Sequence, residues 1–333
     1  MPRYVIASMS PLPESLIESY FAPYLKGTGI EVEVVGVYGK SGEELREVLR
    51  RTDVVIGDYT FKMKIDEEVC SYMEKVKLIQ QPSTGFDHID VEACRRRGIP
   101  VANAGGSNSL SVAEYTIMAA LALLKRLIYA HEKTRQGEWP QWELMDLGTY
   151  DLYGKTWGII GLGRIGSEVA KRLKPWGVRL LYYDKVRRRD LEESLGVEYR
   201  RLPRLLRESD IVSIHLPLTE ETRGMIGERE LRAMKPGAIL INPSRGEIVD
   251  EEALAKALRE GWIGGAALDV YSREPPGEDH PLIRLAREGR VNIIVTPHIA
   301  GANTDARQRI VRFSVENVLR VLRGEEPQAV VNM

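Results

Sequence analysis

Cysteine is scarce in this chain, whose 333 residues include only Cys70 and Cys94. Each lies in a segment whose pattern predicts a helix, so we expect that neither a disulfide framework nor a zinc site is built from them. The sequence therefore predicts a protein of a reducing cytoplasm with no bound metal ion.

Long apolar runs and an excess of one charge are also missing. The most apolar stretch, residues 115–124, is well under the ~20 residues of a membrane-spanning helix. The first residues lack an apolar run followed by a small-residue cleavage site, so no export is expected. Because 47 basic and 48 acidic residues give a net charge of −1, neither nucleic acid nor a membrane surface is expected as a partner. A small molecule is the better expectation.

The chain is long enough to form two domains. Short β-branched segments alternate with helical segments within residues 4–103 and again within residues 155–297. Such alternation is typical of βαβ units, which build mainly parallel sheets. A long, mostly apolar helix from Ser111 to Arg126 is predicted between the two series, and a last helix over residues 303–322. The sequence thus predicts an α/β fold in two domains.

A glycine-rich motif follows the first predicted strand of the second series. Its residues are Gly161, Leu162, Gly163, Arg164, Ile165 and Gly166. The apolar strand TWGII leads into it, and residues 167–174 are predicted to form a helix after it. Backbone N–H groups at such a helix N-terminus can hold a pyrophosphate, and glycines allow its close approach. This context favours a dinucleotide site over a glycine turn that binds no nucleotide.

Asp184 ends the next predicted strand, where a carboxylate can accept hydrogen bonds from the adenosine ribose hydroxyls. It could also be a plain cap of the strand end. The carboxylate would repel the extra phosphate of NADP, whereas Arg187, Arg188 and Arg189 could attract it. We expect NAD as the cofactor, with NADH preferred over NADPH.

Two further residues follow predicted strands at the carboxyl end of the sheet, where ligands bind in open α/β folds. Arg245 follows AILINPS, and His298 follows NIIVTP and precedes small residues that leave room for a ligand. A planar guanidinium can hold the carboxylate of a 2-keto acid and polarise its carbonyl, while an imidazole supplies the proton. Taken alone, each residue is more often a surface ion-pair partner or a structural histidine.

These residues lie in motifs that resemble the D-isomer-specific 2-hydroxyacid dehydrogenases, most closely their glyoxylate/hydroxypyruvate reductase branch. The motifs are STGFDHID, SVAE, GLGRIG with Asp184, HLPLT, NPSRGEIVD, LDVYSREPP and TPHIAG, in family order over nearly the whole chain. The resemblance implies two Rossmann-like domains. One is a doubly wound parallel-sheet NAD-binding domain, residues 107–298. The other is a smaller flavodoxin-like substrate domain, residues 1–106 with 299–333.

The resemblance also implies the catalytic roles. Arg245 binds the carboxylate and carbonyl of the substrate, His298 is the general acid/base, and Glu274 hydrogen-bonds His298. Physical chemistry agrees with this pairing, because a neighbouring carboxylate favours the protonated imidazole. The backbone amides of Ser83, Thr84 and Gly85 are implied to bind the substrate carboxylate, although an ordinary turn explains this segment equally well on sequence alone.

Further residues are assigned by the same resemblance to the cofactor. Asp269 is placed near the nicotinamide carboxamide, and His215 is a wall of the cofactor site. The remaining contacts are the six residues of the glycine motif with Asp184, Pro217, Thr222, Pro243, Ser244, His298 and Gly301. Of the other histidines, His88 is expected to cap or pack, and His131 and His280 look like surface residues.

Trp139 and Trp142 follow the long central helix, where aromatic pairs usually serve plain dimer packing. In the reductase branch a matching tryptophan reaches from one subunit into the substrate site of its neighbour. Trp142 occupies that motif position. A symmetric homodimer is therefore implied by the resemblance.

Several alternatives stay open. Formate dehydrogenases pair the histidine with glutamine where this chain has Glu274, and phosphite dehydrogenase resembles a variant with lysine where this chain has Thr84, so both are less favoured. Phosphoglycerate dehydrogenase remains, although the regulatory domain common in that branch does not follow Asn332. An NADH-sensing binding protein, like the related transcriptional corepressors, would keep Arg245, Glu274 and His298. The favoured prediction is an NAD-dependent reductase of glyoxylate or hydroxypyruvate.

Overall fold

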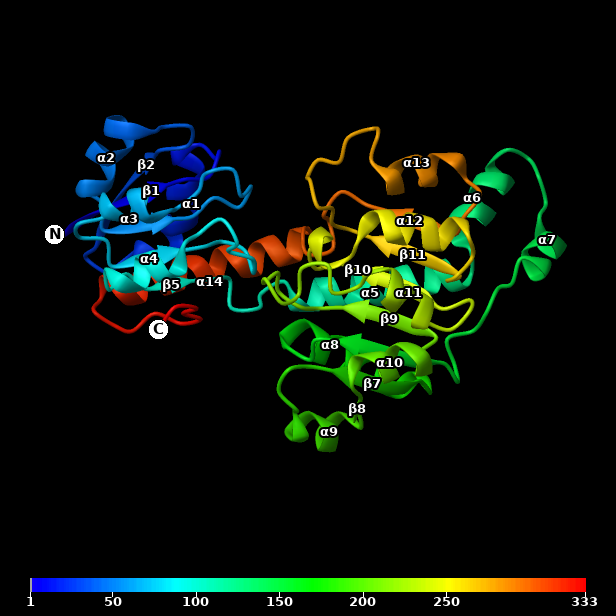
Figure 1. Cartoon of the computed structure of the whole chain (residues 1–333). Helices are drawn as coiled ribbons and strands as arrows, with labels where there is room; N and C mark the ends of the chain where they lie inside the picture. Colours follow the sequence, from blue (N-terminus) through cyan, green and yellow to red (C-terminus); the bar gives the residue numbers. More distant parts are fainter. Residues whose placement is uncertain (1) are drawn as a thin grey trace. The chain divides into compact units, whose positions relative to one another are not determined.

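The computed structural model describes residues 2–333 and divides the chain into two compact units (Figure 1). Unit 1 comprises the chain up to Asn108 together with Thr304–Met333, and unit 2 comprises Ser109–Asn303. The boundaries expected from sequence, after residues 106 and 298, lie slightly earlier in the chain. Within the described residues, no helix is long and apolar enough to cross a membrane.

Unit 1 is built on a five-stranded parallel sheet with the strand order β2-β1-β3-β4-β5, the order of flavodoxin-like folds. The strands are β1 (Arg3–Ser8), β2 (Glu31–Gly36), β3 (Val54–Ile56), β4 (Leu78–Gln80) and β5 (Val101–Ala102). The helices are α1 (Glu14–Leu25), α2 (Gly42–Arg50), α3 (Glu67–Ser71), α4 (Val91–Arg96) and α14 (Thr304–Leu322).

Helices cover both faces of the unit 1 sheet, because successive side chains of a strand point to opposite faces. Ile6 packs with Phe21 of α1 and Val318 of α14. The next residue, Ala7, packs on the other face in the cluster that contains Leu49 of α2. Near-continuous apolar runs such as that of β1 are thus explained by burial on both sides of a parallel sheet.

The two cysteines lie in the same apolar cluster of unit 1. Cys70 in α3 and Cys94 in α4 are both fully buried, and their Sγ atoms lie 3.0 Å apart. Both are free thiols in this structure. Helical segments that are separate in the sequence meet here because α3 and α4 pack against each other, a contact that local sequence patterns do not reveal.

Unit 2 contains a seven-stranded parallel sheet with the order β12-β11-β10-β9-β6-β7-β8. The strands are β6 (Thr156–Ile160), β7 (Arg179–Tyr183), β8 (Glu198–Tyr199), β9 (Ile211–Ile214), β10 (Ile239–Asn242), β11 (Gly265–Leu268) and β12 (Ile293–Val295). From β6 the chain proceeds through β7 to one edge and from β9 to the other, so β6 and β9 flank the switch point of a doubly wound sheet. Ligands bind at such a switch point, outside the carboxyl ends of the strands.

Two helical layers enclose the unit 2 sheet. Ile160 belongs to the cluster formed with helices α10 (Leu202–Glu208), α11 (Glu228–Ala233), α12 (Glu251–Arg259) and α13 (Pro281–Glu288). Its neighbour Ile159 belongs to the opposite cluster, formed with α5 (Ser109–Leu124) and α8 (Arg164–Leu173). The remaining helices are α6 (Leu127–Arg135), α7 (Gln141–Asp146), α9 (Arg189–Leu195) and the 3-10 turns η1 (Lys174–Trp176) and η2 (Gly246–Ile248).

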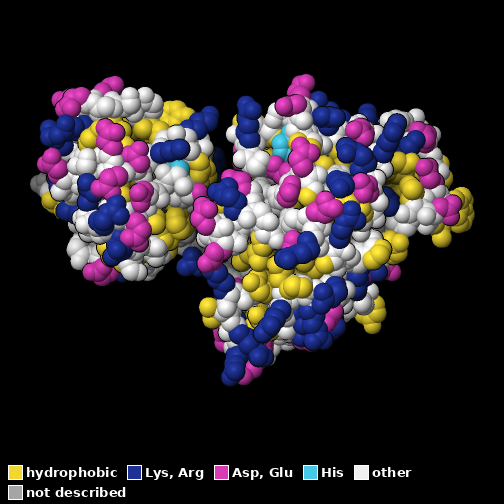
Figure 2. Space-filling model, viewed as in Figure 1, with side chains coloured by type: hydrophobic (Ala, Val, Ile, Leu, Met, Phe, Trp, Pro, Cys, Tyr) yellow, Lys and Arg dark blue, Asp and Glu magenta, His cyan; other side chains and the backbone are white. Residues whose placement is uncertain are grey.

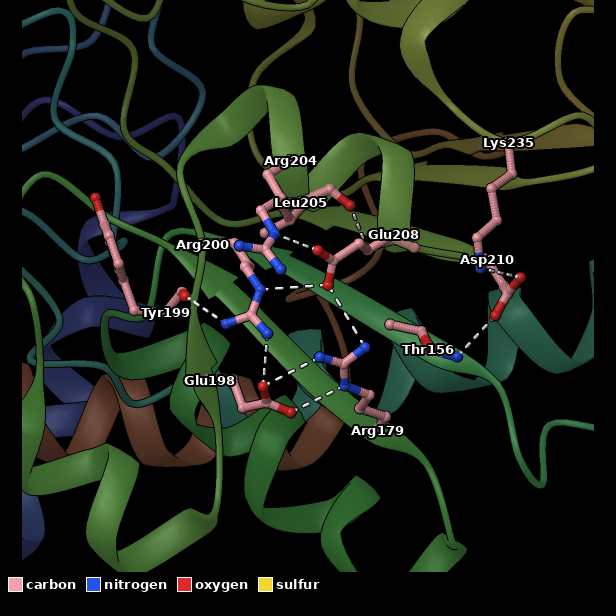
Figure 3. Close-up of polar contacts among 11 residues, drawn as sticks. Thr156, Arg179, Glu198, Tyr199, Arg200, Arg204, Leu205, Glu208, Asp210 and Lys235 are labelled. Atoms are coloured by element: carbon pink, nitrogen blue, oxygen red, sulfur yellow. Dashed lines mark hydrogen bonds and ion pairs between the residues drawn. The ribbon is translucent and has the colours of Figure 1, made fainter.

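An ion-pair network lies at the β8 edge of this sheet (Figure 3). Glu198 pairs with Arg179 and Arg200, and Glu208 pairs with Arg200 and Arg204. The hydrogen bond from Arg179, followed by that from Arg200, lowers the pKa of Glu198 to about 2, although burial opposes the shift. Charged side chains at an edge strand disfavour pairing with another chain, so the network protects the open edge of the sheet.

Candidate active site

The glycine loop forms the turn between β6 and α8. Gly161 has a φ of +95°, which L side chains rarely adopt, and a Cβ at Gly166 would lie 2.1 Å from the Gly161 carbonyl oxygen. A Cβ at Gly163 would meet nothing within 4 Å, so this side of the loop is open. The helix begins at Arg164, earlier than the predicted residue 167, and its N-terminus therefore stands directly at the loop. An open glycine surface at a helix N-terminus fits the pyrophosphate of a dinucleotide.

Asp184 follows β7 and lies beside this loop. Its Oδ2 accepts a hydrogen bond of 2.8 Å from the backbone N–H of Leu162, so the carboxylate orders the glycine loop. Among residues 2–333, no hydrogen bond uses its second oxygen, Oδ1. That oxygen is available to a ribose hydroxyl, as the sequence analysis expected of Asp184.

Two of the three arginines that could attract the extra phosphate of NADP, Arg187 and Arg188, have carboxylate partners. Arg187 donates to Glu192 from Nε and Nη2, both at 2.8 Å. Arg188 donates in the same bidentate manner to Asp190. Their charges are therefore partly neutralised within unit 2, which weakens the argument for NADP.

His215 lies just after β9, next to the glycine loop. Trp157 Nε1 donates to Ser213 Oγ at 2.9 Å, and the same oxygen lies 3.0 Å from His215 Nε2. The other ring nitrogen of His215, Nδ1, is buried and has no partner among residues 2–333. Burial lowers the pKa of His215 to about 3, so the ring is neutral. A buried ring nitrogen without a protein partner at this place fits a site that accepts a polar ligand.

Other expected cofactor residues lie on loops that follow strands of the same sheet. Thr222 Oγ1 donates to the Pro217 carbonyl at 2.8 Å in the loop after β9. Pro243 and Ser244 follow β10, where the N–H and hydroxyl of Ser244 both donate to Asn242 Oδ1. These contacts fix the shape of the loops around the switch point.

The three candidate catalytic side chains come from loops that follow β10, β11 and β12. Arg245 follows β10, and Asn242 Nδ2 donates to its carbonyl oxygen at 2.8 Å. Glu274 Oε2 lies 2.7 Å from His298 Nδ1, and both side chains are partly exposed. Burial raises the pKa of Glu274, but the hydrogen bond and charge of His298, with the charge of Arg245, outweigh it and lower that pKa below its usual value. Glu274 is thus an anion at neutral pH.

The His298 loop is held by a buried carboxylate. Asp269 Oδ1 accepts from the Thr296 hydroxyl at 2.6 Å and from Ile299 N–H at 2.8 Å, while Oδ2 accepts from Ala300 N–H at 2.7 Å. The Asp269 carbonyl also accepts from His298 N–H, and His298 has a φ of +55°. Burial raises the pKa of Asp269 despite these bonds. Asp269 therefore shapes the loop that presents the imidazole, a role that the sequence analysis missed; Gly301 completes the loop's turn.

Gly246 permits the close approach of the loops that carry Arg245 and Glu274. A Cβ at Gly246 would lie 2.0 Å from the Tyr271 carbonyl carbon, so no other residue fits there. Tyr271 N–H in turn donates to Glu274 Oε1 at 3.0 Å. In the sequence, the only indication of this role is that Gly246 directly follows Arg245.

A second carboxylate, that of Glu251, fixes the loop that carries Glu274. Glu251, at the start of α12, accepts from the N–H and hydroxyl of Ser272 and lies 3.1 Å from His280 Nε2. The His280 side chain is only 9% exposed, which corrects its assignment to the surface. The sequence misled because His280 stands in a polar segment whose fold places the ring edge against Tyr271. His131 is exposed, as expected.

The segment of Ser83, Thr84 and Gly85 belongs to unit 1 and follows β4. Ser83 Oγ donates to the Gly85 carbonyl at 2.7 Å, and Thr84 Oγ1 donates to Asn108 at 2.6 Å. Within residues 2–333, the backbone N–H groups of these three residues donate no hydrogen bond. They are therefore available to an anion. Nearby, His88 packs edge-on against the Phe61 ring.

Trp142 lies in α7 with 71% of its surface exposed, and Trp139, just before this helix, is 79% exposed. None of the residues of α6 or α7 is buried. Hydrophobic side chains are visible at the surface around α7 (Figure 2). This segment buries too little surface in the single chain to explain its helices.

Comparisons with known proteins identify the family. The model of the D-isomer specific 2-hydroxyacid dehydrogenase NAD-binding domain matches residues 117–300, more than half of the chain. The chain belongs to this dehydrogenase family. The matched residues fall within unit 2, and this dehydrogenase is therefore an NAD-dependent oxidoreductase of 2-hydroxyacids.

Individual relatives agree with this assignment. The dehydrogenase is 46% identical over 269 residues to the glyoxylate reductase of Korarchaeum cryptofilum, covering 80% of each chain. It is 45% identical over 294 residues to that of Thermofilum pendens, covering 88% of this chain and 85% of the relative. The solved D-lactate dehydrogenase of Aquifex aeolicus, complexed with NAD and lactic acid, superposes with a TM-score of 0.81 at 32% identity and 96% coverage of both chains. The predicted family, α/β fold class and NAD cofactor are confirmed.

Proposed function

We propose that this dehydrogenase reduces a small 2-keto acid, glyoxylate or hydroxypyruvate, to the 2-hydroxy acid, with Arg245, Glu274 and His298 as its catalytic residues. The observation that carries the proposal is the 2.7 Å contact between Glu274 and His298, with the charge of Arg245 acting on the same carboxylate. The relatives named glyoxylate reductase support the substrate.

The residues divide the reaction as follows. Bound NADH supplies a hydride to the carbonyl carbon. Arg245 holds the substrate carboxylate and polarises the carbonyl, so that negative charge can develop on its oxygen. His298 gives a proton to that oxygen from Nε2, because Nδ1 faces Glu274. We further propose that the free N–H groups of Ser83, Thr84 and Gly85 donate to the substrate carboxylate.

The direct test is an NADH-oxidation screen of the purified chain against glyoxylate, hydroxypyruvate, pyruvate and bulkier keto acids. We expect the highest kcat/KM with one of the first two. Tight binding of NADH without turnover of any keto acid would contradict the proposal and support an NADH sensor. Preferred oxidation of 3-phosphoglycerate would assign the chain to the phosphoglycerate branch.

We propose that NADH is preferred over NADPH because of Asp184. Asp184→Asn keeps an oxygen for Leu162 N–H but removes the charge that repels the extra phosphate. We expect the ratio of kcat/KM for NADPH to that for NADH to rise about tenfold, equivalent to ~1.4 kcal/mol. A wild-type preference for NADPH, or an unchanged ratio in the variant, would show that Asp184 does not select the cofactor.

We also propose a symmetric homodimer in which the partner covers α6 and α7. Met118, Leu127 and Ile128 are more than half exposed, as are Trp139 and Trp142. An exposed apolar surface of this kind marks an interface, and a second copy is the partner that the family resemblance implies. Sedimentation of the purified chain at micromolar concentration should give the mass of two chains.

Trp142→Ala is expected to change substrate choice, because Trp142 is proposed to reach the substrate site of the neighbouring subunit. The ratio of kcat/KM for hydroxypyruvate to that for a bulkier keto acid should change several-fold, with NADH affinity unchanged. Trp139→Ala is the matched control, since it removes an equally exposed indole from the same segment. Equal ratios in both variants, on material shown to be dimeric, would show that Trp142 serves only in packing.

A further inference from the structure

Cys70 and Cys94 form an isolated thiol pair in unit 1. Both side chains are fully buried, and the Sγ atoms are 3.0 Å apart although the residues are 24 positions apart in the sequence. Ile65, Ile79 and Ala93 belong to the same apolar cluster. Among the described residues no group of three ligands could hold a metal ion. The pair is thus placed to react with itself.

We propose that Cys70 and Cys94 form a reversible intramolecular disulfide when the chain meets a small-molecule disulfide oxidant. The Sγ atoms need to approach by about 1 Å to reach the bond length of ~2.05 Å. The short helices α3 and α4 can supply so small a shift, because each contains fewer than two turns. This inference does not rest on the proposed function.

The chemistry balances with a disulfide as the oxidant. The Cys70 thiolate attacks one sulfur of the oxidant, its S–S bond breaks, and one thiolate leaves. Cys94 then loses its proton to solvent and attacks Cys70 Sγ of the mixed disulfide, and the second thiolate leaves. Two protein thiols are oxidised, and one external disulfide is reduced to two thiols.

The contact between the two thiols favours Cys70 as the first nucleophile. The contact with Cys94 lowers the pKa of Cys70 against burial, and the charge of Arg97 lowers the pKa of both thiols. The same contact, followed by burial, raises the pKa of Cys94. Because the thiolate is the reactive form, the pair divides naturally into an attacking and a resolving cysteine.

Access of the oxidant requires local opening, since neither thiol is exposed. The helix α3 has five residues and α4 has six, and each is held at its start by a single aspartate cap, Asp66 or Asp90. Ion pairs of Glu67 with Arg96 and Arg97 fasten the two helices on the surface. Such short elements open at lower free energy than the sheet, so oxidation should be slow in the folded chain and faster near the onset of melting.

The disulfide would close a loop that contains β4 and the segment of Ser83, Thr84 and Gly85. Cross-linking a loop of this length lowers the entropy of the unfolded chain. We therefore expect the oxidised protein to melt about 5–10 °C above the reduced protein. The cross-link would also restrict the segment from which the free N–H groups project.

The test is incubation of the full-length chain with oxidised glutathione at pH 8, followed by denaturation and alkylation with N-ethylmaleimide. We expect a mass lower by two hydrogens, no alkylation, and a peptide that joins Cys70 to Cys94, all reversed by reductant. Cys94→Ser should instead retain a glutathione adduct on Cys70. The melting temperature of Cys70→Ser/Cys94→Ser should not respond to the oxidant.

The proposal would be overturned if both cysteines stayed fully alkylatable after incubation just below the melting temperature. A stable double glutathione adduct in the wild-type chain would overturn it as well, because the second thiol would then have failed to resolve the first. The extent of alkylation and the glutathione adduct are both measured as changes in mass, so a failure of the proposed enzymatic activity would not affect them.

Discussion

Arg245→Ala is expected to lower kcat/KM for keto-acid reduction about 100- to 1,000-fold, equivalent to ~2.7–4 kcal/mol of barrier. The guanidinium is proposed to hold the carboxylate and to stabilise the charge that develops on the carbonyl oxygen. NADH affinity should change little, because the guanidinium is proposed to hold the substrate and not the cofactor. Steady-state kinetics and fluorescence titration of NADH measure the two effects separately.

Arg229→Ala is the matched control for this prediction. Arg229 is a surface arginine of unit 2, 90% exposed and paired only with the adjacent Glu230 among the described residues. Its loss should leave activity within a factor of two. Arg245→Lys keeps the charge but lacks the planar fork, so it should recover only part of the rate. If Arg245→Ala behaved like Arg229→Ala, the reaction would need a different electrophile.

The fold was predictable from the sequence because local patterns carry it. Parallel strands buried on both faces are apolar throughout, and Ile159 and Ile160 show why, since they face opposite helical layers. The two-residue strand β8 has no such pattern and was missed. The start of α8 was placed too late because Arg164 and Ile165 were assigned to the motif and not to the helix that the motif opens.

The supporting contacts of the site could not be predicted in the same way. Arg245 and His298 have side chains whose chemistry suggests a role, and their motifs fix their order. Glu251 is far in the sequence from Ser272 and His280. Only the packing of α12 against the loop that contains Ser272 brings these residues together. The meeting of the two cysteines has the same origin. Tertiary contacts between polar or thiol groups leave no periodic signal in one sequence.

The contact between Glu274 and His298 makes the pH dependence of both reaction directions predictable. The pKa of Glu274 is lowered, so its carboxylate is charged at neutral pH. Glu274→Gln removes this charge but keeps a hydrogen-bonding group. The protonated imidazole then loses its anionic partner, and the acid form of His298 that reduction requires disappears at lower pH. We expect the alkaline limb of kcat/KM for reduction to move to lower pH, with a rate loss of about 100-fold at its former optimum.

Oxidation of the 2-hydroxy acid supplies the independent check. This direction requires the neutral imidazole, which the variant forms at lower pH, so its acid limb should move in the same direction and activity at low pH should rise relative to the optimum. Glu278→Gln, an exposed substitution in the same loop, should leave both profiles in place. An isotope effect should first show that hydride transfer is rate-limiting in both directions. If the two limbs of Glu274→Gln then stayed fixed or moved in opposite directions, Glu274 would not act on the charge of His298. Its role would be to position the loop through Tyr271 N–H.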